Sequence, residues 1–531
     1  MDESAIMLGL LAHNIHEKLL ESDTTSVILT EEQVESLSEI PMLFIDAGSM
    51  SDERGFVTKL ALFTRVKEGN KVREAIYHPV PKVEKKWFLP IFFSSENDKA
   101  RQAFTYLIEL AAIYAALTNP RKVFKRDVDK AMIFRHGPLV QMLSQYLSEP
   151  YLVNAYDAIN ALIYAGLSER DALTLVEDAY KCDSKGGIPV KDRNVVILGL
   201  LILNLLKKIK EEVDRNRKIA VLGVVEDVSQ SKSLLAYSIS RILCTIRREA
   251  KSYGGLSADH LASLIATFIM NKMQDLNFEE VLRDCLCLDL NHESFTNIMN
   301  NVEYAWIDLI EHLEHFLRTR FRKGLAEATP SEVEAAFLWS GLTEMNDAYF
   351  MYTLYYVSKN KVPFTKPIEN KARFEIFKRY LKSKKYLKCY SEYYSEMESI
   401  DDLAEVFMYR YIAPVYPLDE LRCNIIKEVL SRNTKLNVGP CAITNLITVP
   451  SPMRIEFISG EPLVKEGLSF AFYSSILTTY GFPTQLLLVD RYSRVSILDL
   501  LSIEDLLDVL SKRFKPYSVF VHKWITRRAF M

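Results

Sequence analysis

The fold class is decided by the segment Pro41-Met42-Leu43-Phe44-Ile45-Asp46-Ala47-Gly48-Ser49. Its apolar run predicts a buried strand, and the small residues after Asp46 predict a turn. The next apolar segment, Phe56 to Val66, predicts the second strand of a hairpin. Asp46 is therefore expected at the carboxyl end of a central strand. There it either caps the turn with its own side chain or serves as a rigid metal ligand.

Composition indicates an ordinary globular protein. The 531 residues are 49% hydrophobic and 25% charged, which is enough chain for about two to four domains. The formal net charge of -3 means that any nucleic-acid surface must be local. The N-terminus lacks the basic start of a signal peptide, so we expect a soluble, cytoplasmic protein without a membrane span. Of the seven cysteines, only Cys285 and Cys287 are close, which favours reduced thiols over a zinc site.

Strand and helix patterns alternate up to about residue 250. The clearest helix, Asp98 to Thr118, is followed by Asn119-Pro120, which predicts its end. Further strands are predicted at Ala131 to Phe134 and at Lys218 to Val225. This alternation is typical of an α/β layer with a mixed or parallel sheet.

Helical periodicity then dominates, most clearly at Glu303 to Arg322, and strand texture returns at Met453 to Ile458. We therefore expect a core in two parts, residues 1–255 and 441–531, with a helical insertion at 256–440.

Polar residues follow the predicted strands. Asp46, His136 and the pair Glu226-Asp227 stand at strand ends, and Glu109 lies on the long helix among apolar neighbours. Strand-end carboxylates with one helix carboxylate form the arrangement with which RNase H-like nucleases hold two divalent metals. Each of these residues alone also fits an ordinary cap or a surface position.

The chain resembles the archaeal DNA-end-processing nuclease family NurA in a series of short motifs that occur in the same order. The matching segments are Asp46-Ala47-Gly48-Ser49, Leu107-Ile108-Glu109-Leu110, His136-Gly137-Pro138-Leu139, Gly223 to Ser233, Arg454-Ile455-Glu456 and Gly481-Phe482-Pro483, followed by Asp490. The resemblance implies an α/β fold, an RNase H-like mixed sheet core flanked by helices, here with a large all-helical insertion.

The resemblance also implies a function. Asp46, Glu109, Asp227 and His136 would be catalytic and bind Mn²⁺ or Mg²⁺. The protein would be a homodimer that processes DNA ends together with a hexameric HerA-type ATPase. His136 departs from the family, which has an Asp at this position. Because neutral imidazole brings no charge to a metal, the alternative is a catalytically weak or inactive NurA-like subunit that binds DNA or a partner.

Basic residues mark the expected DNA contacts. The stretch Lys371 to Tyr394 interleaves cations with tyrosines, which suits phosphates and stacked bases but equally a solvated helix face. The family places a His near its C-terminal end close to the site, a role that His522 would fill. The full set of expected DNA-binding residues is Arg54, Arg135, Lys232, Lys382, Lys385 and His522.

Overall fold

The structure is a computed structural model. It describes residues 37–52, 55–79, 82–83, 86–87, 91–92, 98–139, 151–186, 195–216, 218–226, 264, 292–325, 327–329, 332–333, 336–337, 368–369, 410–412, 454–458, 463–476 and 482–495.

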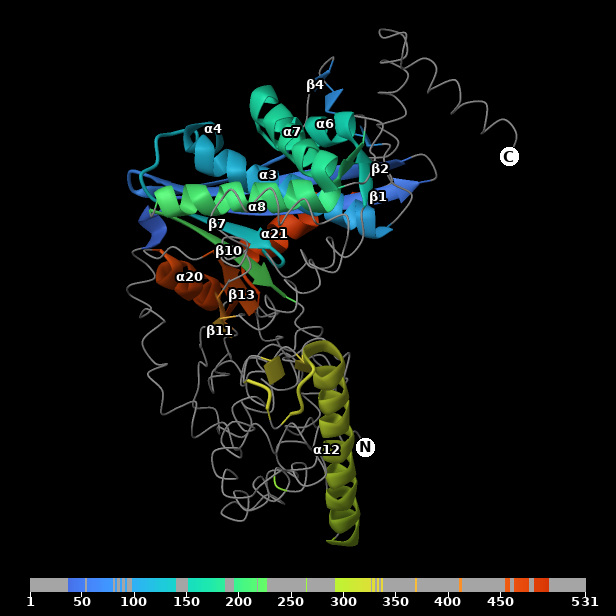
Figure 1. The fold of residues 1–531 in the computed structure, drawn as a ribbon. Coiled ribbons are helices and arrows are strands. Elements are labelled where there is room, and N and C mark those ends of the chain that lie inside the picture. The colour runs from blue at the N-terminus through green and yellow to red at the C-terminus, as the bar shows by residue number, and fades with distance from the viewer. Residues whose placement is uncertain are drawn as a thin grey trace, which may run out of the picture.

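A nine-stranded mixed sheet forms the centre of the described structure (Figure 1). Its order is β11-β12-β13-β10-β7-β1-β2-β3, with β6 also paired to β2. The strands are β1 (Met42–Asp52), β2 (Gly55–Glu68), β3 (Lys71–Tyr77), β6 (Ile91–Phe92), β7 (Ala131–His136), β10 (Ile219–Val225), β11 (Ile368–Glu369), β12 (Arg410–Ile412) and β13 (Arg454–Phe457).

Antiparallel and parallel pairing divide this sheet. β1, β2 and β3 form consecutive antiparallel hairpins, whereas β7 runs parallel to both β1 and β10. β13 and β12 then add antiparallel strands beyond β10. Short separate ladders join β4 (Lys82–Val83) to β5 (Lys86–Trp87) and β8 (Leu152–Asn154) to β9 (Val195–Ile197).

Helices cover both faces of the sheet (Figure 1). α3 and α8 pack on each other, on β1 and on β10, with α6 and α7 outside them. On the other face, α21 packs on β1 and β2 and α20 packs on β10. The helix bounds are α3 (Asp98–Thr118), α4 (Pro120–Phe124), α6 (Ala155–Tyr164), α7 (Glu169–Gly186), α8 (Leu198–Arg215), α12 (His292–Phe321), α20 (Val464–Ile476) and α21 (Thr484–Ser493), and a 3-10 turn, η2, covers Leu37–Glu39.

The predicted α/β fold class is confirmed: a mixed sheet, built from a three-strand antiparallel unit and parallel strands, lies between two helical layers. The predicted bounds of the Asp98 to Thr118 helix agree with α3. Asn119 caps the next helix, accepting a bond from the Lys122 N–H at 3.2 Å, and Pro120 begins it. A proline at this position has no N–H to leave unpaired.

The expected turn at Ala47-Gly48-Ser49 is wrong. β1 continues through these residues to Asp52, because β2 pairs with it along its whole length. What ends near Asp46 is the parallel ladder with β7, whose last pair is Ile45 with Arg135. Asp46 therefore lies where the parallel strands β1 and β7 separate, and not at the end of its own strand.

The block 256–440 is described only in part. α12 agrees with the helix predicted at Glu303 to Arg322 and extends it at the N-terminal end. The block is not all-helical, contrary to the expectation: it also supplies β11 and β12, because β12 pairs with β13 at the side of the core sheet and β11 pairs with β12. Its division from the core at 255 and 440 stays a prediction.

Among the described helices, none combines the length and the apolar character needed to cross a membrane.

Candidate metal centre

Asp46 and His136 each lie two residues beyond an aromatic side chain of the core, Phe44 on β1 and Phe134 on β7. Phe44 of β1 stacks on Phe134 of β7 with ring centroids 4.9 Å apart, and both rings contact Phe470 of α20. Side chains alternate along a strand, so a residue two positions further on faces the same side. Asp46 and His136 therefore lie on the face covered by α20 and α21, just beyond this cluster. The apolar cluster fixes the strands that carry them.

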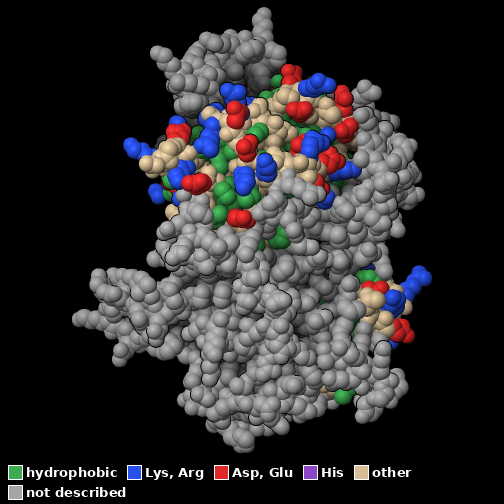
Figure 2. Space-filling model, turned by 90° about the vertical axis from the view of Figure 1, so that its left-hand side faces the viewer, with side chains coloured by type: hydrophobic (Ala, Val, Ile, Leu, Met, Phe, Trp, Pro, Cys, Tyr) green, Lys and Arg blue, Asp and Glu red, His purple; other side chains and the backbone are tan. Residues whose placement is uncertain are grey.

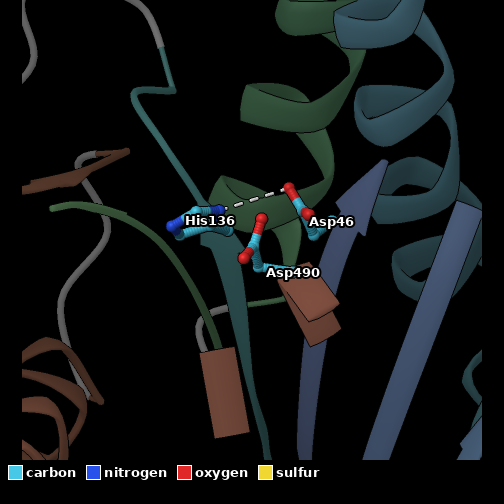
Figure 3. A group of neighbouring side chains, drawn as sticks. All are labelled: Asp46, His136 and Asp490. Atoms are coloured by element: carbon cyan, nitrogen blue, oxygen red, sulfur yellow. Dashed lines mark ion pairs between the residues drawn. The ribbon is translucent and has the colours of Figure 1, made fainter. Parts of the chain in front are cut away.

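Three side chains come together there: Asp46, His136 and Asp490 (Figure 3). One ligand atom from each lies within 4.8 Å of the others. His136 Nδ1 is 3.4 Å from Asp46 Oδ1, and its Nε2 is 3.6 Å from Oε2 of Glu226, directly after β10. Carboxylate oxygens and one imidazole nitrogen form a donor set suited to Mn²⁺ or a similar divalent cation. This group is the candidate metal centre.

The turn after His136 is fixed by backbone geometry. Gly137 adopts a φ of 106°, a conformation that favours glycine, and its N–H donates to the Val224 carbonyl at 2.7 Å. The Arg135 guanidinium donates to the Pro138 carbonyl. The motif His136-Gly137-Pro138 thus ties the end of β7 to β10 and holds the imidazole beside Glu226.

α21 delivers Asp490 to this place and also supports Asp46. The Ser493 hydroxyl donates to Asp46 Oδ2 at 2.5 Å and lies 2.8 Å from the Asp490 carbonyl oxygen. The helix end approaches β1 closely because residue 48 is a glycine. A Cβ on Gly48 would lie 2.4 Å from the Ser493 carbonyl oxygen. The absence of a side chain at Gly48 therefore permits the contact that brings Asp490 beside Asp46.

Electrostatics couple the members of the group. Burial disfavours the charged form of Asp46, yet the hydrogen bonds from His136 and Ser493 outweigh it and keep the pKa of Asp46 below its usual value. Burial likewise works against a charged His136, but the bonds to Asp46 and Glu226 raise its pKa to about 10. At neutral pH the imidazole is therefore protonated in the metal-free protein. A metal ion must displace this proton before the imidazole can bind it.

Glu109, predicted as a metal ligand, has other partners. It lies on α3, which covers the opposite face of the sheet from α21. Its Oε1 accepts the Ala47 N–H at 2.9 Å, and its Oε2 accepts Arg135 Nε at 2.8 Å and Nη2 at 2.5 Å. Burial raises the pKa of the Glu109 carboxyl to about 7, against the opposing effect of Arg135. The structure thus places Glu109 beside the group of Asp46, His136 and Asp490 but outside it. Its bonds to Ala47 and Arg135 link α3 to β1 and β7 at the point where the two strands separate.

Arg135, predicted as a DNA contact, is buried. Its side chain is 8% exposed, its guanidinium pairs with Glu109, and its Cζ lies 4.6 Å from the centre of the Tyr106 ring. The Arg135 guanidinium is therefore not available at the surface to contact DNA. The physical reason is the strand alternation: Arg135 faces α3, whereas its neighbour His136 faces α21.

The remaining predicted site residues lie outside the described part of the chain, and their roles stay predictions. They are Asp227, Arg54, Lys232, Lys382, Lys385 and His522.

The sequence patterns did not identify Asp490 or Ser493 as site residues. A signal was present in the buried stripe of α21, where Leu486, Val489 and Ser493 follow one another at helical spacing after the buried Phe482, which lies just before the helix. A serine that is 1% exposed at the end of an apolar stripe needs a polar partner. That partner, Asp46, is 447 residues away in the sequence, so the stripe alone could not name it.

The described surface carries charges of both signs. Figure 2 shows Lys and Arg side chains interspersed with Asp and Glu over the face of the α/β unit that it displays. This face therefore has no extended region of one charge sign among the described residues.

Comparison with known proteins gives distant similarities. No protein-family model matches the chain, and no curated protein matches it. The chain is similar to the NurA nuclease from Sulfolobus solfataricus, with 14% identity, a TM-score of 0.32, and coverage of 94% of this chain and 93% of that one. It is also similar to a structure of NurA with manganese, with 9% identity, a TM-score of 0.31, and coverage of 94% and 96%.

Proposed function

We propose that this protein is a metal-dependent nuclease that hydrolyses phosphodiester bonds in DNA. The observation that carries the proposal is the convergence of Asp46, His136 and Asp490 at the edge of an RNase H-like sheet, where the parallel strands β1 and β7 separate. Open α/β sheets bind their ligands at the carboxyl ends of their parallel strands, where neighbouring strands separate.

The residues present fit a divalent cation. Asp46 and Asp490 supply negative charge, His136 supplies a nitrogen, and Glu226 stands within reach of the same imidazole. When bound, such a cation lowers the pKa of water and stabilises charge on a phosphate under attack. Asp46 is 7% exposed and is held by Ser493, so it contributes a carboxylate with little freedom to reorient. Rigid ligands of this kind are what catalysis at a metal requires.

The sequence resemblance to NurA motivates the finer parts of the proposal. These are DNA ends as the substrate, Mn²⁺ or Mg²⁺ as the cofactor, a homodimer as the active form, and a hexameric HerA-type ATPase as the partner. Light scattering of the purified protein tests the dimer. Stimulation of digestion by a HerA-type ATPase tests the partner.

The nuclease activity itself is tested with end-labelled DNA and purified protein. We expect digestion with Mn²⁺ and none with EDTA. Asp46→Asn and Asp490→Asn should each slow digestion by about a hundredfold or more. Each substitution replaces a charged carboxylate ligand by a neutral amide of nearly the same shape. The matched control is Asp127→Asn, which removes an exposed carboxylate in an ion pair with Arg121. Digestion by Asp46→Asn at the wild-type rate would show that the activity arises elsewhere.

A second candidate is a NurA-like subunit that binds DNA or a partner without cutting. Two observations favour it: His136 stands where the family has an Asp, and the Glu109 carboxylate is committed to Arg135. Fewer negative ligands hold metal ions less tightly. Binding of Mn²⁺ and DNA by the wild type without any cleavage would identify this second function.

A further inference from the structure

Arg494 adjoins the metal centre from the end of α21. Its Nη2 donates to Asp490 Oδ2 at 2.6 Å, and its backbone N–H donates to the Asp490 carbonyl oxygen at 3.3 Å. A Cβ on Gly48 would lie 3.3 Å from the Arg494 Cα, so this backbone is packed on β1 two residues after Asp46. The guanidinium also interacts through space with the charges of Asp46 and Glu226. Arg494 is therefore a member of the rim of this site.

The side chain of Arg494 is 75% exposed, in contrast to the buried guanidinium of Arg135. An exposed ion pair is screened by water and contributes little to stability. The Arg494–Asp490 pair can therefore break at small cost, while the backbone of Arg494 stays anchored. Only the side chain needs to rotate.

The negative charges of the centre favour an exposed, movable cation beside it. Asp46, Asp490 and Glu226 surround one imidazole, and a phosphate that approaches these carboxylates is repelled. A cation bound to Asp490 would break the ion pair between Asp490 and Arg494. It would occupy the Asp490 carboxylate and repel the Arg494 guanidinium, which would then be available for a phosphate. The planar fork of arginine binds phosphate oxygens in a bidentate manner.

We propose that Arg494 is a metal-dependent phosphate contact: it pairs with Asp490 in the metal-free protein and transfers to a substrate phosphate when a divalent cation occupies Asp490. The inference rests on the proposed metal-dependent function and adds the residue that links metal binding to substrate binding. It also makes Arg494 a competitor of the metal for Asp490.

The test compares Arg494→Ala with Arg491→Ala, which removes an equal charge from an exposed position on the same helix. Binding of a fluorescent DNA duplex with cleavage-resistant phosphorothioate linkages is measured by anisotropy, with Mn²⁺ and with EDTA. Arg494→Ala should weaken binding about tenfold with Mn²⁺, the loss of one charge-assisted contact, and much less with EDTA. Arg491→Ala should have the same small effect in both conditions.

Calorimetric titration with Mn²⁺ alone provides the second readout. Arg494→Ala should bind Mn²⁺ more tightly than the wild type, because a competing cation has been removed from Asp490. Arg494→Lys should keep part of the Mn²⁺-dependent DNA binding, since it retains the charge but not the fork.

Equal losses for Arg494→Ala with Mn²⁺ and with EDTA would overturn the inference, as would losses no larger than those of Arg491→Ala. A wild type that binds no Mn²⁺ would overturn it as well. Failure of the wild type to cleave ordinary DNA, with the Mn²⁺-dependent binding intact, would remove the nuclease assignment and leave the role of Arg494 supported.

Discussion

At the scale of single residues, His136 decides how the centre responds to pH. The imidazole bridges Asp46 and Glu226, and these contacts raise its pKa to about 10 although burial works against the charged form. In the metal-free protein it therefore acts as a cation between two carboxylates. It could bind a metal ion only after losing a proton.

This competition predicts a strong pH dependence of metal binding. Below pH 10 each bound ion displaces one proton from His136, so the affinity for Mn²⁺ should rise roughly tenfold per pH unit between pH 6 and 8. His136→Asp should bind Mn²⁺ more tightly at pH 7 and should lose most of this slope, because an Asp is already ionised. Titration calorimetry in buffers of different ionisation enthalpy measures the released proton directly.

The control for this prediction is His312→Asn, which changes a half-exposed histidine on α12 that contacts Asp308. It should leave both the affinity and its slope as in the wild type. An affinity for Mn²⁺ that is unchanged in His136→Asp would show that residue 136 is not a ligand.

At the scale of elements, the site depends on the contact between β1 and the end of α21. β1 contributes Asp46, α21 contributes Asp490 and Ser493, and Gly48 lets the two backbones approach. The apolar face of the helix fixes its position on the sheet, since Leu486 and Val489 are fully buried. The arrangement of Asp46 and Asp490 is therefore set by how closely α21 packs on β1.

Gly48→Ala tests this contact. The added Cβ would lie 2.4 Å from the Ser493 carbonyl oxygen, a backbone atom that cannot swing away. We expect α21 to shift outward, at a cost of about 1–3 kcal/mol in the free energy of unfolding, and Mn²⁺ affinity to fall. Urea denaturation and calorimetry measure the two effects. Ser49→Ala, one residue further along β1, is the control and should change neither quantity appreciably; a Gly48→Ala variant with unchanged Mn²⁺ affinity would contradict the role given to this contact.

At the scale of the whole molecule, the sheet is assembled from segments far apart in the chain. β13 pairs with β10, and β12 from the block 256–440 pairs with the other side of β13. The block therefore contributes to the core sheet as well as carrying helical structure such as α12. A strand edge that has lost its partner is a site for aggregation.

Two excisions test this contribution. Replacing residues 256–440 by a short linker removes β12 and exposes β13, so we expect a lower unfolding temperature and aggregation. Replacing only residues 290–350 removes α12 but keeps β11 and β12, and we expect a better preserved core. Thermal unfolding and size-exclusion chromatography compare the two variants. Equal behaviour of both would show that β12 contributes nothing essential to the sheet.

Local patterns in the sequence predicted much of the core. The hairpin around Asp46, the bounds of α3 and the strands β7, β10 and β13 follow from apolar periodicity and from breakers such as Asn119-Pro120. These features depend on neighbours within a few residues, which is why the sequence alone determines them. The same patterns brought out Asp46 and His136, because each follows an apolar run in the sequence.

Only the tertiary structure decided the composition of the site. It brought Ser493, and Asp490 with it, to Asp46 although Ser493 is 447 residues away in the sequence. It also paired Glu109 with Arg135 and turned Arg135 and His136 to opposite faces of β7. A carboxylate carries no local mark of whether its partner will be a metal, a guanidinium or a backbone N–H. That choice depends on strand register and helix packing, which are properties of the whole fold.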